Sequence, residues 1–117
     1  FFFRLNTYLI VYILLDNLKF NIVAMVNKNI IKIRKKLDKL DQSLLQIIEK
    51  RTKLIDVVIK NKKYKKDIID KKRISVILKK IKIKSKNKKI DPKITHKIWS
   101  SMIKAYIDYE YRNFKKK

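Results

Sequence analysis

The sequence predicts an all-α protein whose chain forms one long, one short and one medium helix. Apolar residues recur at steps of three and four along most of the chain, which is the period of an α-helix. The 117 residues include no glycine and a single proline, so few positions would interrupt a helix. The hydrophobic fraction of 46% is enough for a folded core, and the net charge of +23 therefore does not imply disorder. This length fits one domain at most.

Residues 1–24 differ from the rest and are expected to be an N-terminal extension of uncertain status, followed by a helical domain at 25–117. Their apolar run, Tyr8 to Leu15, is shorter than the roughly 20 residues that span a bilayer. No small-residue cleavage site of a secretion signal follows it. We expect a dispensable extension or a misassigned start ahead of Met25, no stable membrane insertion and a cytoplasmic location. A weak membrane anchor is the alternative.

The first helix of the domain is predicted from about Asn29 to Lys62. Its apolar stripe consists of Ile33, Leu37, Leu40, Leu44, Ile48, Ile55 and Val58. A helix of about 34 residues is roughly 50 Å long, too long to be covered by a compact monomer of this size. The pattern therefore predicts an intertwined helical homodimer.

The second and third helices follow two breaks in this pattern. The first break falls at 63–66, and Asp67 or Asp70 could cap the second helix. Residues 84–89 are expected to be a polar linker. Asp91-Pro92 is a clear start signal for the third helix, an N-cap aspartate followed by proline at the first helical position. This helix is expected to run to about Phe114.

The residue inventory restricts the chemistry. There is no cysteine and only one histidine, which removes thiolate chemistry and the usual metal clusters, and no cofactor or metal is expected. The charge invites a nucleic-acid interpretation, but lysine is spread over every segment rather than clustered with arginine on one face. A basic module that binds nucleic acid or an acidic partner remains an alternative, and no specific nucleic-acid partner is expected.

Two cations interrupt the apolar stripe of the first helix. Arg51 and Lys62 share a face roughly 16 Å apart, a separation that suits a small anion between two long side chains. Arg34 lies roughly 25 Å before Arg51 on the same rod and about 100° round it. It could reach the same ligand only from an antiparallel partner chain.

The later helices add further candidates. Asp70 and Arg73 are one turn apart and can face the same point, although an exposed pair of this kind is often only a surface ion pair. On the third helix a stripe ends in a carboxylate; its members are Trp99, Ile103, Tyr106 and Glu110.

This ordered set resembles the all-helical (AroQ-type) class of chorismate mutase from about Ile33 to Tyr111. The opening segment, Ile33 to Leu45, has Arg34 ahead of a Leu-Asp-x-x-Leu-Leu core (Leu40-Asp41-Gln42-Ser43-Leu44-Leu45), as that class does. Glu49-Lys50-Arg51 matches its next arginine, and Lys62 matches the lysine that ends its first helix. Asp70-x-x-Arg73, Ile90-Asp91-Pro92 and Glu110 match the later helices.

The resemblance implies an isomerase that rearranges chorismate to prephenate, a step of aromatic amino-acid biosynthesis, without nucleophile, metal or cofactor. Arg51 and the partner's Arg34 would clamp the carboxylates, and Lys62 would reach a carboxylate and the ether oxygen. Asp70 would meet the ring hydroxyl, Arg73 would line or brace the pocket, and Glu110 would donate a hydrogen bond to the ether oxygen.

Two positions depart from the family pattern. Ile74 stands where the family often has a glutamate, and Tyr106 where it often has a small hydroxyl residue. Both are expected to line the pocket, with Asp70 and the Tyr106 hydroxyl as possible substitutes. A degenerate, non-catalytic mutase domain is therefore a further alternative.

Overall fold

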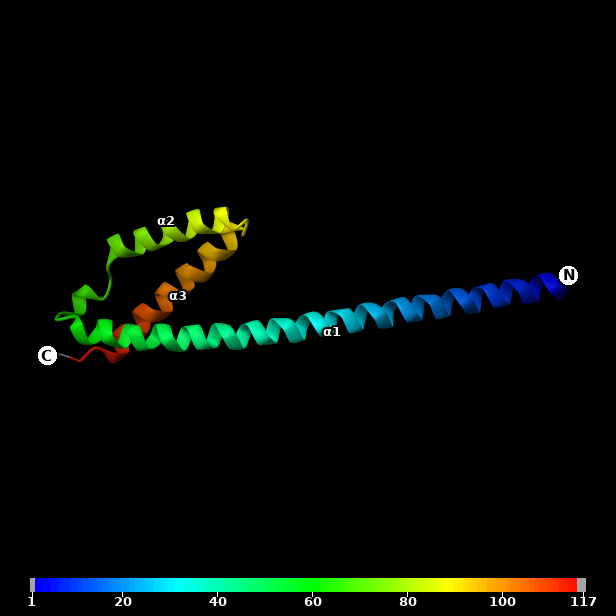
Figure 1. Cartoon of the computed structure of the whole chain (residues 1–117), viewed down its shortest axis with the longest axis horizontal. Coiled ribbons are helices and arrows are strands. Elements are labelled where there is room, and N and C mark those ends of the chain that lie inside the picture. Colours follow the sequence, from blue (N-terminus) through cyan, green and yellow to red (C-terminus); the bar gives the residue numbers. More distant parts are fainter. Residues whose placement is uncertain (1, 116–117) are drawn as a thin grey trace. The chain divides into compact units, whose positions relative to one another are not determined.

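The computed structural model describes the backbone of residues 2–115 and the side chains of residues 7–115. Within this part the chain forms three α-helices, α1 (Phe2–Asn61), α2 (Lys71–Asn87) and α3 (Pro92–Asn113), with a short 3₁₀ turn at Lys65–Asp67 (Figure 1). The all-α class and the order of long, short and medium helix are confirmed.

Helix α1 is much longer than the regular apolar pattern indicated, because it begins at Phe2 rather than near Asn29. The isolated polar residues Asp16 and Asn17 do not interrupt it, since neither removes a backbone donor as proline would. An 18-residue window near its N-terminus has a mean hydropathy of 1.8, and none of that window is buried. By length and composition this part could cross a membrane, although a signal sequence has the same properties. The status of residues 1–24 stays a prediction.

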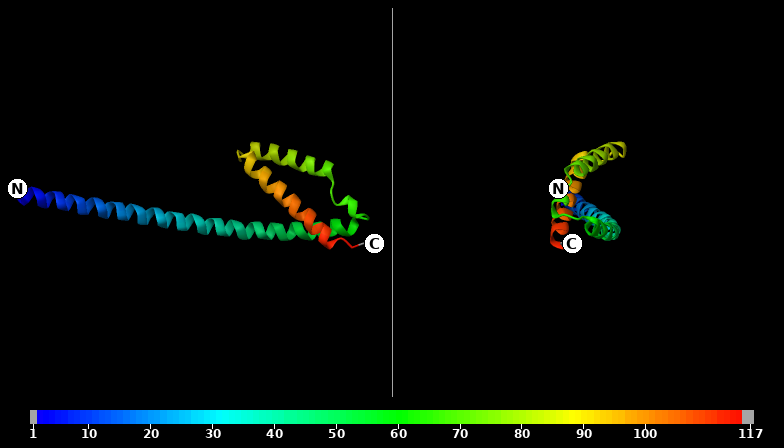
Figure 2. Two further views of the ribbon diagram at one scale, coloured as in Figure 1. Left: turned by 180° about the vertical axis from the view of Figure 1, so that it is seen from behind. Right: turned by 90° about the vertical axis from the view of Figure 1, so that its left-hand side faces the viewer.

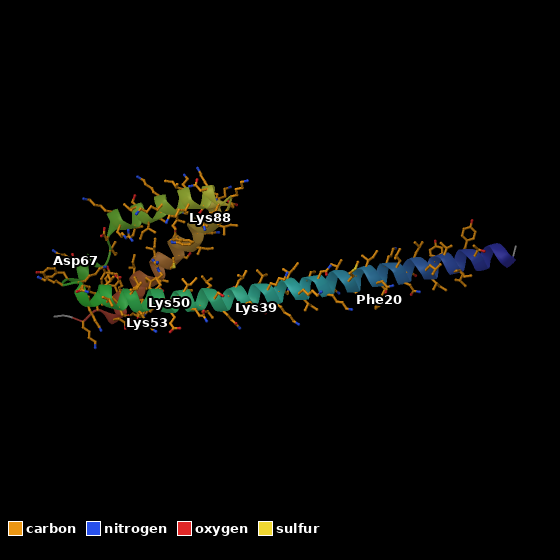
Figure 3. All side chains as sticks on the ribbon, in the orientation of Figure 1. Phe20, Lys39, Lys50, Lys53, Asp67 and Lys88 are labelled. Atoms are coloured by element: carbon orange, nitrogen blue, oxygen red, sulfur yellow. The ribbon has the colours of Figure 1, made fainter. Side chains whose placement is uncertain are left out.

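The chain divides into two compact units, Phe1–Ile47 and Ile48–Lys117. In the first unit every described side chain except that of Ala24 is exposed, so this part of α1 has no core of its own. Phe20, for example, is 72% exposed and projects from the helix (Figure 3). The predicted apolar stripe is exposed as well, with Leu37 at 52% and Leu40 at 65%.

The connection between α1 and α2 is short, and a capping hydrogen bond fixes its end. Asp70 is the N-cap of α2, and its Oδ1 accepts a hydrogen bond from the backbone N–H of Arg73 at 2.9 Å. Of the two predicted caps, Asp70 is therefore the correct one, whereas Asp67 ends the 3₁₀ turn. The predicted break at 63–66 is confirmed in position, since α1 ends at Asn61 and α2 begins at Lys71.

The expected polar linker at 84–89 was wrong for most of its length, because α2 continues to Asn87. The helix ends in a Schellman-type turn, with hydrogen bonds from Ile90 N–H to the Ser85 carbonyl and from Lys89 N–H to the Lys86 carbonyl. Lys89 has φ 57°, in the left-handed region that glycine usually occupies. This chain has no glycine, so a lysine takes that conformation.

Helix α3 starts as predicted, with Asp91 as N-cap and Pro92 at the first turn. It packs against α2 and hydrogen-bonds the last turns of α1, and the left view of Figure 2 shows it running from the corner with α2 to the end of α1. At the α2–α3 corner the buried Ser85 hydroxyl donates to Thr95 Oγ1 at 2.8 Å. The last turns of α1, together with α2 and α3, therefore surround the space in which the predicted site residues meet.

Candidate active site

A cavity of about 270 Å³ lies between α1, α2 and α3 in the second unit. Its lining includes every residue of this unit that the sequence assigned to the site: Arg51, Lys62, Asp70, Arg73, Ile74, Tyr106 and Glu110. The remaining predicted residue, Arg34, lies exposed on α1 within the first unit and is not part of this lining. The cavity thus combines three cations with two carboxylates and has one net positive formal charge.

Lys62 and Glu110 form an ion pair inside the cavity. The ammonium nitrogen lies 3.1 Å from Glu110 Oε2 and also donates to the carbonyl oxygen of Ile68 at 3.3 Å. The lysine side chain is 20% exposed and that of the glutamate 7%, so the pair is largely removed from water. An ammonium has three N–H donors, and these two acceptors leave one donor for a ligand among the described residues.

Arg51 lies beside an aromatic ring. Its Cζ is 5.5 Å from the centroid of the Tyr106 ring, within the range of a cation–π contact. Its Nε is buried and has no hydrogen-bond partner among the described residues. Buried donors are rarely left unpaired, because the lost hydrogen bond to water costs about 1–3 kcal/mol.

The Tyr106 hydroxyl is held by α1. It lies 2.8 Å from Thr52 Oγ1 and 3.3 Å from the carbonyl oxygen of Ile48. Because the Thr52 hydroxyl donates to the same carbonyl at 2.8 Å, the Tyr106 hydroxyl donates to Thr52, to Ile48 or to both. Its single proton is therefore directed to α1 and not to a molecule in the cavity.

At the start of α2 the lining changes from polar to apolar. Asp70 is exposed, and one of its oxygens is engaged in capping the helix. Arg73 is exposed and lines both this cavity and a second one that it shares with Arg51, Lys80, Lys84 and Trp99. Ile74 places an alkyl side chain at the position where a glutamate would have added a carboxylate.

A second tyrosine ties α3 to α1 beside the cavity. The Tyr109 hydroxyl donates to Asp56 Oδ1 at 2.6 Å, and its ring meets that of Tyr106 edge to face, with centroids 6.3 Å apart. The hydrogen bond to Asp56, with smaller contributions from desolvation and from the negative charge of Asp56, raises the pKa of Tyr109 above its ordinary value. This contact fixes the face of α3 from which Tyr106 and Glu110 project.

Sequence reasoning missed three groups that shape the site: Thr52, Asp56 and the Ile68 carbonyl. The first two are hydrogen-bond partners of tyrosines more than 50 positions later in the chain, and their spacing on α1 gives no local signal of those partners. The Ile68 carbonyl is a backbone group, which side-chain patterns do not report. The spacing of Thr52 and Asp56 offered a hint, since polar residues four positions apart share one face of a helix.

A sequence model of chorismate mutase type II matches residues 33–111, which is more than half of the chain. The chain belongs to this family. The match covers the whole cavity lining and also Arg34. No curated protein and no solved structure matches the chain significantly.

Membership in the all-helical chorismate mutase class agrees with the observed fold, in which the described part is helical apart from short connections. The residues that line the cavity are also consistent with this family. A pocket lined mostly by cations and isoleucines, without a cysteine nucleophile or glycine loop, suits a reaction that needs only binding and charge stabilisation.

Proposed function

We propose that this chain is an active chorismate mutase that rearranges chorismate to prephenate. The observation that carries the proposal is the meeting of Arg51, Lys62 and Arg73 in one cavity, in which the Nε of Arg51 has no partner among the described residues. Chorismate is a dianion, and an arginine can bind a carboxylate through two parallel hydrogen bonds.

The reaction breaks one C–O bond and forms one C–C bond within the same molecule. The cavity would hold the substrate in its compact conformer, in which the two ends approach each other. Negative charge then grows on the ether oxygen as the C–O bond breaks. The remaining N–H donor of Lys62 would stabilise that oxygen. Glu110, once protonated and released from its ion pair with Lys62, would donate a second hydrogen bond to it.

The proposal includes a homodimer in which the partner completes the site. One chain supplies a single net positive charge, whereas the substrate carries two negative charges. Arg34 from a partner would add the second positive charge. The exposed stripe of α1, with Ile33 at 56% and Leu44 at 53%, would be covered by the partner's first helix.

Substitutions on α1 test the site with a control on the same helix. Arg51→Ala and Lys62→Ala should each lower kcat/KM for chorismate by several orders of magnitude, because substrate recognition and charge stabilisation are lost together. Lys53→Ala removes an equal charge from α1, but Lys53 pairs with Glu49 and its side chain is 73% exposed, so activity should be unchanged. Near-normal turnover in Arg51→Ala would refute the proposed site.

A further inference from the structure

We propose that Tyr106 is a positioning residue that holds the Arg51 guanidinium in place for the substrate carboxylate. This inference rests on the proposed function, since the carboxylate is that of the proposed substrate. Tyr106 occupies a family position at which a small hydroxyl residue is often found, so its ring is an addition that needs its own explanation. The explanation lies in two contacts, one made by the ring and one by the hydroxyl.

The ring contact fixes the cation. Arg51 carries a long side chain with several rotatable bonds, and within the described residues its Nε has no acceptor to hold it. The Tyr106 ring lies 5.5 Å from Cζ and attracts the guanidinium through its electron-rich face. A π face does not occupy the N–H donors, so they remain available for a carboxylate. A carboxylate at the same place would bind Arg51 more strongly but would compete with the substrate.

The hydroxyl contact fixes the ring. The 2.8 Å hydrogen bond to Thr52 ties the far end of the Tyr106 side chain to the residue that follows Arg51. The positions of the Tyr106 ring and of the Arg51 guanidinium are therefore both fixed relative to the same turn of α1. The edge-to-face contact with Tyr109 supports the ring from the other side. These contacts leave Tyr106 few alternative rotamers, which lowers the entropy lost when Arg51 binds an anion.

The role differs from that of a substrate-binding hydroxyl. The Tyr106 proton is directed to Thr52 or to the Ile48 carbonyl, so the residue would not donate to the substrate. Removing only the hydroxyl should therefore have a modest effect, whereas removing the ring should release Arg51. A simple space-filling role predicts neither this order nor any change at Arg51 itself.

Two variants of the full chain separate these contributions. Tyr106→Met keeps much of the volume but has no π face, and KM for chorismate should rise roughly 3- to 30-fold while kcat changes less. Tyr106→Phe keeps the ring and should raise KM by a smaller factor. Tyr111→Leu is the matched control, since this α3 ring contacts Lys65 and not Arg51, and its KM should equal that of wild type. Equal KM increases in the Phe and Met variants would overturn the proposal.

Nuclear magnetic resonance of the Arg51 Nε–H group tests the contact without relying on turnover. In wild type the ring current of Tyr106 should shift this proton upfield; the shift should persist in Tyr106→Phe and Tyr111→Leu and disappear in Tyr106→Met. A wild-type resonance without the shift would overturn the inference even if Tyr106→Met failed to fold. A wild-type protein with the shifted resonance but no chorismate turnover would instead refute the proposed function while leaving the Tyr106–Arg51 contact established.

Discussion

Lys62, one residue beyond the end of α1, and Glu110, near the end of α3, form a 3.1 Å ion pair inside the cavity. The two residues are 48 positions apart, so the fold brings them together only when α3 returns to α1. Both are also held within one unit of the chain, and the pair places a donor and a carboxyl group at one point of the cavity wall. The stabilisation of negative charge in the proposed reaction depends on these two side chains.

The first prediction concerns Glu110 and the ether oxygen. A carboxylate at this point would repel the negative charge that grows on that oxygen, whereas a hydrogen-bond donor would stabilise it. Glu110→Gln places an amide N–H donor at the same point, so it should keep substantial kcat/KM for chorismate. Glu110→Ala removes the donor and should lower kcat/KM by about 100-fold or more.

Glu49→Gln is the control for this substitution, because Glu49 lies on the exposed surface of α1, paired with Lys53. Its kcat/KM should equal that of wild type. If Glu110→Gln abolished turnover, or Glu110→Ala left it unchanged, Glu110 would not be the donor to the ether oxygen.

The second prediction concerns Arg34 and the partner chain. Arg34→Ala should inactivate the enzyme, and so should Arg51→Ala. In a mixture of the two inactive variants, hybrid dimers contain one site with both arginines intact, so part of the activity should return. The measurement is chorismate turnover after the two proteins are unfolded together and refolded.

Mixing would restore no activity if Arg34 served the site of its own chain. If Arg34 had no part in the site, Arg34→Ala would be active by itself. Sedimentation provides the independent check on assembly. A well-folded monomer at micromolar concentration would contradict both the dimer and the shared site.

The third prediction concerns Tyr109 and stability. Tyr109→Phe removes the hydrogen bond to Asp56 and should lower the Tm at neutral pH. The pKa of Tyr109 is raised in the folded protein, mainly by this hydrogen bond, so the neutral form is the one that stabilises the fold. The contribution of this hydrogen bond to stability is fully present below the ordinary tyrosine pKa of about 10. It is lost as the pH rises through the raised pKa of Tyr109.

The difference in Tm between wild type and Tyr109→Phe should therefore be constant from about pH 6 to pH 9 and shrink at higher pH. Comparing the two proteins at each pH cancels the titration of the many lysines that they share. A difference that stayed constant well above pH 10, or that grew there, would contradict the role of this hydrogen bond.

The sequence was sufficient to predict the helical class and the elements that have strong local signals. Asp91-Pro92 started a helix as expected, because a capping side chain and a missing backbone donor act within three residues. The end of α2 could not be located in this way. Its Schellman turn is normally marked by glycine, and here Lys89 adopts the left-handed conformation without any distinctive residue.

The site was predictable where the side chains carry charge on an apolar face. Arg51 and Lys62 stood out on the first helix because a cation on the apolar face of a helix is costly unless it is paired. Thr52 and Asp56 did not stand out, because a threonine or aspartate is ordinary on the polar side of a helix and their tyrosine partners come from α3. Long-range hydrogen bonds of this kind leave no periodic signal in the sequence.

The measurement that tests the central claim most directly is the loss of chorismate absorbance in the presence of the purified chain, with prephenate identified as the product. The proposed function predicts conversion of chorismate to prephenate without any added metal or cofactor, at a rate that Arg51→Ala reduces by several orders of magnitude and Lys53→Ala leaves unchanged. A folded wild-type protein that binds chorismate but does not convert it, or that converts it equally well after Arg51→Ala, would contradict the account.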